Sequence, residues 1–118
     1  MSASLRSVLE HLTRQRGVRA SLIVSESDGL VVDSSLRFGQ DGERVAALAA
    51  SVYRKARRSA QAARLGAVSF LQLDAERGRI CVAGGGGAND LVIVTVADPE
   101  ANVGLIRMEL FKALEMLA

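Results

Sequence analysis

Aromatic residues and cysteine are scarce in this 118-residue chain, and each scarcity excludes a class of protein. Three Phe, one Tyr and no Trp make up 3% of the sequence, so the core has to be built from Val, Leu, Ile and Ala. A single cysteine, Cys81, excludes an internal disulfide framework, and together with the only histidine, His11, it cannot form a zinc site. Cys81 lies in an apolar strand pattern, which indicates a buried structural thiol. His11 falls off the apolar stripe of its helix and is interpreted as a surface residue.

Long hydrophobic runs are also missing. No stretch approaches the roughly 18 to 20 apolar residues that cross a bilayer, and residues 1–6 lack the apolar run of a signal peptide. We therefore expect a cytoplasmic protein without membrane insertion. The length predicts one domain over residues 1–118, and the share of hydrophobic residues, 49%, is typical of globular proteins.

Motifs that carry chemistry are not found either. The four glycines at 84–87 lack a following Lys-Ser or Lys-Thr and lie between two strands, so they indicate a hairpin connection and not a phosphate site. With one histidine no catalytic triad can be assembled, and the acidic residues fall in turns or at strand ends. We predict that the protein is not an enzyme and has no catalytic, cofactor-binding or metal-binding residues.

Residues 40–64 form the most informative stretch, which reads as one long helix. Asp41 can cap its start, and Gly66 is expected to end it with a left-handed conformation. Six basic and two acidic residues give this stretch a net charge of +4, whereas the whole chain carries +2. The predicted inward stripe consists of apolar residues at helical spacing: Val45, Leu48, Ala49, Val52, Ala56, Ala60 and Ala63.

The other side of this helix carries small residues, namely Ala46, Ala47, Ala50 and Ala62, with Tyr53 on its flank. Small side chains let a second backbone approach closely, so a partner helix is favoured there. The bases at 54–58 have two interpretations, a solvated helix face or a surface that binds a partner.

Hydrophobic periodicity predicts the remaining elements. Further helices are expected over 4–15 and after Asp98-Pro99, with strands over 19–25, 30–34, 67–74, 79–83 and 91–97. The strand 91–97 is apolar on both sides, which predicts a central position with helices on both faces of the sheet. Phe38 is expected to anchor the crossing into the long helix. The order is α-β-β-α-β-β-β-α around an antiparallel sheet.

This element order, together with Gly17-Val18, the hairpin at 27–32 (Ser-Asp-Gly-Leu-Val-Val) and the closing segment at 102–107 (Asn-Val-Gly-Leu-Ile-Arg), resembles the Roadblock/LC7 family and its bacterial MglB-like branch. The resemblance covers nearly the whole chain. It implies a profilin-like α/β (α+β) fold, with a five-stranded antiparallel sheet in the order 2-1-5-4-3. One long helix would cover one face and the N- and C-terminal helices the other.

The resemblance also implies a homodimer built from the edge strand and the long helices. The residues expected at that interface are Ala46, Ala50, Tyr53, Val68, Phe70 and Leu71. The function implied is a non-catalytic regulator or scaffold of a small Ras-like GTPase, which in the MglB-like case activates the GTPase. The partner would contact Arg54, Lys55 and Arg58.

The residues leave one alternative open, a basic nucleic-acid-binding module that uses the bases at 54–58. The near absence of aromatic side chains for base stacking disfavours it.

Overall fold

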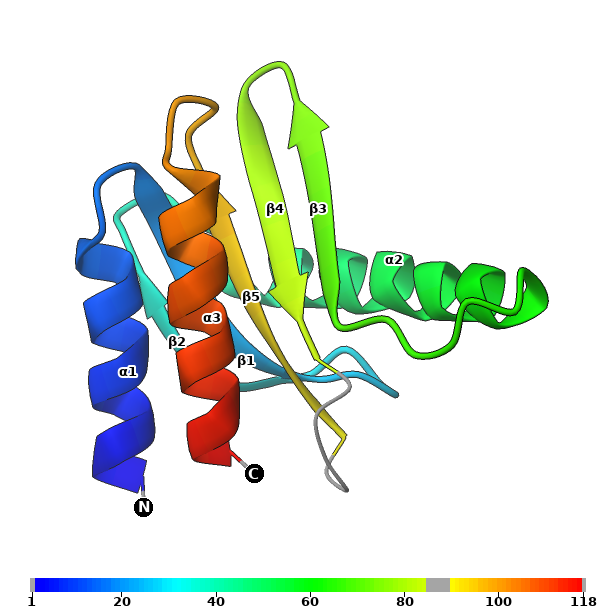
Figure 1. Cartoon of the computed structure of the whole chain (residues 1–118). Coiled ribbons are helices and arrows are strands. Elements are labelled where there is room, and N and C mark those ends of the chain that lie inside the picture. The colour runs from blue at the N-terminus through cyan, green and yellow to red at the C-terminus, as the bar shows by residue number, and fades with distance from the viewer. Residues whose placement is uncertain (1, 85–89, 118) are drawn as a thin grey trace.

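Three helices and five strands alternate along the chain in a computed structural model that describes residues 2–84 and 90–117 (Figure 1). In chain order they are α1 (Ser2–Arg14), β1 (Val18–Ser25), β2 (Val31–Leu36), α2 (Gly42–Ala62), β3 (Phe70–Ala75), β4 (Gly78–Ala83), β5 (Leu91–Ala97) and α3 (Val103–Leu117). The order of elements is the predicted one. The hairpin predicted for the glycine run falls largely on residues 85–89, which lie outside the described residues.

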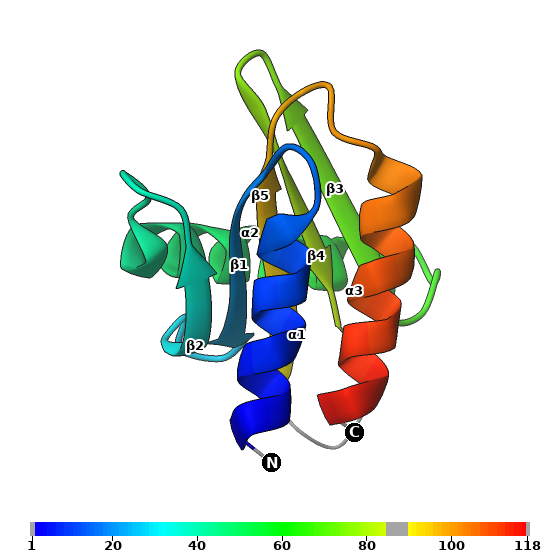
Figure 2. The ribbon, with the colours of Figure 1, turned by 90° about the vertical axis from the view of Figure 1, so that its left-hand side faces the viewer.

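The five strands form one antiparallel sheet in the order β2-β1-β5-β4-β3. Helices α1 and α3 cover one face, and α2 crosses the other (Figures 1 and 2). The predicted fold class is therefore confirmed. β5 lies in the middle and buries both faces, because its side chains alternate between the two layers of helix.

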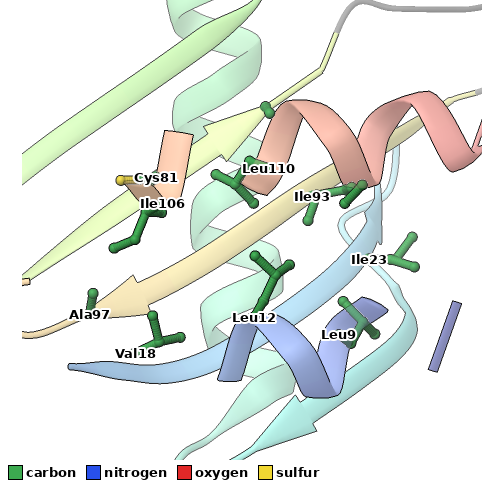
Figure 3. Close-up of a cluster of buried hydrophobic side chains, with 11 residues drawn as sticks. Leu9, Leu12, Val18, Ile23, Cys81, Ile93, Ala97, Ile106 and Leu110 are labelled. Carbon is green, nitrogen blue, oxygen red and sulfur yellow. The ribbon is translucent and has the colours of Figure 1, made fainter. Parts of the chain in front are cut away.

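Two apolar cores lie on the two faces of the sheet. Under α1 and α3, large aliphatic side chains such as Leu9, Leu12, Ile93 and Leu110 pack together with Cys81 (Figure 3). Cys81 is fully buried as predicted, and burial raises the pKa of its thiol. Under α2, the second core combines aliphatic strand residues with the helix residues Ala46, Ala49, Ala50 and Tyr53.

Helix α2 begins as predicted but ends by a different device. The Asp41 side chain accepts a hydrogen bond from the Arg44 amide at 3.2 Å, which confirms the predicted cap. At the other end Arg64 takes a left-handed φ of 59°, and the Leu65 amide bonds back to the Ala60 carbonyl at 2.8 Å. This bond closes the last turn, so the helix ends before Gly66, although Gly66 takes the predicted left-handed conformation with a φ of 88°.

The two sides of α2 were assigned the wrong way round in part. Ala46, Ala50 and Tyr53 face the sheet and are fully buried, whereas Leu48 and Val52, predicted to face inward, are exposed. Both sets recur at helical spacing, so periodicity alone could not choose between them. The row that contains the small residues is the buried one, because α2 crosses the strands closely. The larger aliphatic side chains remain outside.

Several boundaries also differ from the prediction. α3 starts at Val103, where the Asn102 side chain accepts from the Leu105 amide, so Pro99 precedes the helix and does not open it. β3 starts at Phe70, which leaves residues 67–69 outside the strand. Phe38 is wholly exposed and anchors nothing within the chain.

Candidate functional site

An apolar surface remains uncovered beside β3, on the face of the sheet that α2 crosses. Leu48 and Val52 of α2 are 56% and 36% exposed, and Leu73 of β3 is 38% exposed. Together with Leu71, Ile80 and neighbouring side chains they line a small pocket between α2 and the last two strands of the sheet. Such a cluster of exposed apolar side chains is characteristic of an interaction surface.

β3 itself is an open edge. It is the last strand of the sheet, so one row of its backbone N–H and C=O groups faces outward. Within residues 2–84 and 90–117, no side chain forms a hydrogen bond with the β3 backbone. The C-terminal turns of α2 project past this edge (Figure 1). Edge and helix therefore offer one continuous surface.

Most of the residues predicted for a dimer interface lie elsewhere. Ala46, Ala50 and Tyr53 belong to the chain's own core, so they present no surface to a partner. Phe70 packs against Phe111 of α3, with ring centroids 5.9 Å apart, under the Arg107 guanidinium. 

The last two predicted interface residues lie next to α2. The partly buried Val68 accepts a hydrogen bond from the Tyr53 hydroxyl through its carbonyl. Only Leu71 lines the uncovered pocket beside β3.

The basic residues of α2 divide into two groups. Arg57 forms an ion pair with Glu26 at 3.0 Å, and Arg54 donates to the carbonyls of Glu26 and Ser27. These two arginines hold the turn between β1 and β2 against α2. Arg54, predicted to contact a partner, is therefore half-buried and engaged within the chain.

Lys55 and Arg58, the other two predicted contacts, are exposed. Among the described residues neither side chain forms an ion pair. No acidic residue occurs in the sequence between Glu43 and Asp74, so this end of α2 keeps an uncompensated positive charge.

Sequence reasoning missed a polar junction next to these arginines. Asp90, just before β5, accepts from the amide and hydroxyl of Ser27 and from the hydroxyl of Ser25. The hydrogen bonds from Ser27 lower the pKa of the Asp90 carboxyl, because they stabilise its charged form. Residues so far apart in sequence gave no local signal of this contact.

Tyr53 forms a second part of the junction. Its hydroxyl donates to the Val68 carbonyl, and burial raises the pKa of the phenol, with the Glu26 carboxylate adding to the effect. Gly84 fits beside it because a Cβ at that position would lie 2.8 Å from the Tyr53 hydroxyl oxygen. Tyr53 thus ties α2 to the segment that leads into β3.

The last observations concern metal binding, membrane spans and the single histidine. Among residues 2–84 and 90–117, no group of three or more His, Cys, Asp or Glu side chains could hold a metal ion. No helix in the same residues is long and apolar enough to span a membrane. His11 is half-exposed as predicted and lies 3.3 Å from Glu109 of α3.

Comparison with known proteins identifies the family. The chain is 30% identical over 110 residues to the uncharacterized protein MJ1340 of Methanocaldococcus jannaschii, with 93% of both chains covered. A Roadblock/LC7 domain from Streptomyces avermitilis superimposes with a TM-score of 0.83 at 18% identity, covering 94% of this chain and 92% of that one. MglB of Myxococcus xanthus gives 0.83 at 18% identity, with 97% and 91% covered. The family model for the Roadblock/LC7 domain matches residues 5–97, and the chain therefore belongs to the Roadblock/LC7 family.

Proposed function

We propose that this protein is a non-catalytic homodimeric regulator of a small Ras-like GTPase. The observation that carries the proposal is the open β3 edge beside the exposed apolar side chains of α2. Membership of the Roadblock/LC7 family and the structural likeness to MglB support it. The dimer would supply a composite surface that neither protomer has alone.

The dimer would form by pairing β3 with its copy across a two-fold axis. That pairing satisfies the outward backbone groups of the edge strand, which otherwise invite aggregation. It also brings Leu71 and Leu73 next to their copies and covers them. An isologous interface of this kind is the commonest arrangement among homo-oligomers.

The outer face of α2 fits the same two-fold axis. Its exposed and half-exposed apolar residues Val45, Leu48 and Val52 follow one another in steps of three and four, which is the spacing of a helix seam.

The GTPase would contact the basic end of α2. Lys55 and Arg58 are the exposed members of the predicted set and would steer encounter with an acidic patch on the partner. Arg54 would contribute by positioning the turn between β1 and β2, because its guanidinium is already bound to the carbonyls of that turn.

The test measures association with a small Ras-like GTPase from the same genome, loaded with GTP or GDP, at two salt concentrations. We expect the double variant Lys55→Ala, Arg58→Ala to remain a dimer but to associate more slowly, with a flatter salt dependence. Each exposed charge typically changes the association rate more than the dissociation rate. Arg14→Ala, an exposed base on α1, is the matched control and should change neither quantity.

Two results would contradict the proposal. One is a protein that sediments as a monomer at micromolar concentration. The other is a double variant that binds every GTPase tested as the wild type does. Tight, steeply salt-dependent binding of duplex or single-stranded DNA would instead favour the nucleic-acid alternative. The structure weakens that alternative, because Arg54 and Arg57 are engaged by the β1–β2 turn.

A further inference from the structure

The opposite edge of the sheet also carries exposed apolar side chains. Of the eleven large apolar side chains that the described part of the chain exposes, four lie between residues 30 and 38. We call these four residues, which follow one another along β2 and the connection after it, the β2 corner: Leu30, Val32, Leu36 and Phe38. Phe38 is wholly exposed in a chain that has only three Phe, on a connection between β2 and α2 that projects from the body of the molecule (Figure 2). An exposed phenyl ring of this kind is typical of a binding anchor.

A groove runs next to the β2 corner, between β2 and the first turn of α2. It has a volume of about 490 Å³ and an apolar floor that includes Val31 and Leu36. Its other wall carries the carboxylates of Asp41 and Glu43, and no basic residue lines it. One Asp41 oxygen caps α2, which leaves the carboxylate with further acceptor capacity.

The nearest bases on the β2 side are already engaged. Arg37 donates to the carbonyls of Val18 and Thr13, and Arg6 forms an ion pair with Asp33 at 2.7 Å. The residues that line the groove therefore combine apolar surface with negative charge, and Arg44, the base in the same turn of α2, is not among them. The complementary occupant carries apolar and basic side chains together.

The backbone of β2 excludes one mode of binding. Arg6 donates to the Ser34 carbonyl and the Asp33 carboxylate accepts from the Ser34 amide, so the outward groups of Ser34 are occupied. The pairing with β1 also skips Val32, which forms a bulge. An added strand would find the groups of Ser34 occupied and the edge interrupted by the bulge. The occupant is recognised through side chains and not through main-chain pairing.

We propose that the β2 corner and its groove dock a basic amphipathic helix of a partner protein. Apolar side chains at helical spacing would pack on Phe38 and Leu36, and Lys or Arg side chains on the helix flank would meet Asp41 and Glu43. This is the helix-in-groove mode of peptide recognition. The site lies at the edge opposite β3 and does not depend on the function proposed for that edge.

The probe is a synthetic amphipathic helical peptide of leucine and lysine, titrated into the isotope-labelled full chain and followed by NMR. A charge-reversed peptide of leucine and glutamate is the matched control ligand. We expect saturable shifts centred on residues 30–43 with the lysine peptide, and binding at least about tenfold weaker with the glutamate peptide.

Two variants assign the binding to the site. Phe38→Ala should weaken the lysine peptide about tenfold or more. The double variant Asp41→Asn, Glu43→Gln should weaken it while keeping the helix cap, since Asn caps as well as Asp. Leu65→Ala removes another well-exposed apolar side chain, beyond the far end of α2, and should leave binding unchanged. Thermal unfolding confirms that each variant is folded.

Four results would overturn the proposal: equal binding of the two peptides, wild-type binding by Phe38→Ala, weakening by the Leu65 control, or shifts that centre elsewhere on the surface. A fifth concerns self-association. If the wild type assembles beyond a dimer and Phe38→Ala abolishes that step, the occupant is a second copy of this chain and not a partner helix.

Discussion

β2 and β3 are the two outer strands of one sheet, yet side chains close the first edge and leave the second open. At β2 the Arg6 side chain bonds the outward carbonyl of Ser34, and its ion-pair partner Asp33 bonds the outward amide. A bulge interrupts the strand, and Thr13 donates to the Ser35 carbonyl. At β3 the described residues supply no such cover. An edge strand is protected either by its own chain or by a partner, and within the described residues only β2 has the first kind of protection.

The helices next to the two edges explain the difference. α1 lies over β2 and carries Arg6 and Thr13 within reach of its backbone. α2 crosses the sheet in the other direction and projects past β3, so it extends the open edge and does not cover it (Figure 1). Only the second arrangement involves the packing of α2 on the sheet.

The largest expected effect comes from breaking that packing. Ala50→Glu would bury a carboxylate between α2 and the strands, where Ala50 is fully buried. We expect a loss of unfolding free energy on the order of 4 kcal/mol or more, enough to unfold a marginal domain. Chemical denaturation measures it. Ala47→Glu, three residues earlier on the exposed side, should cost little, and equal destabilisation by both would contradict the observed helix face.

The next effect compares the two edges directly. Leu71→Asp places a carboxylate in the pocket beside β3, and Val32→Asp places one on the bulge of β2. Desolvating an unpaired charge at an interface costs several kcal/mol, so Leu71→Asp should raise the dimer dissociation constant on the order of 100-fold.

Sedimentation equilibrium measures the dissociation constants of both variants. Val32→Asp should dimerise as the wild type does. If the Leu71→Asp variant still dimerises, or if the Val32→Asp variant dissociates, the dimer interface does not lie at β3.

The smallest effect is a pH dependence confined to the β3 side. Burial raises the pKa of Tyr53 above its ordinary value of 10.0, so folding favours the protonated phenol that donates to Val68. This stability is fully present below pH 10.0 and is lost as the pH rises through the raised pKa. We expect the protection factors of amide hydrogens in the segment before β3 to fall at alkaline pH, while those of β2 stay constant.

Tyr53 is the only tyrosine and the chain has no tryptophan, so phenolate absorbance reports its titration directly. A midpoint no higher than that of a free tyrosine would contradict the prediction. Tyr53→Phe keeps the ring but lacks the ionising group, and its exchange rates should lose the added alkaline dependence.

Much of the fold was determined by the sequence alone. The doubly apolar strand β5, the Asp41 cap and the apolar stripes of α1 and α3 are local patterns whose physical meaning does not depend on the rest of the chain. Because aromatic residues and cysteine are scarce, the core had to be built from Val, Leu, Ile and Ala. These features, with the order of elements, sufficed to predict the layers of helix and the central place of β5, whereas the strand order was implied by the resemblance to the Roadblock/LC7 family.

The helical periodicity of α2 did not determine which of its faces is buried, and the tertiary structure decided this. Alternative apolar rows fit that helix, and only the close approach of the sheet selected Ala46, Ala50 and Tyr53 for the core and left Leu48 and Val52 outside. The same holds for the arginines, because Glu26 lies in a turn 28 residues before Arg54 in the chain. Which bases are engaged and which edge is open follow from contacts between distant residues, and no local pattern records them.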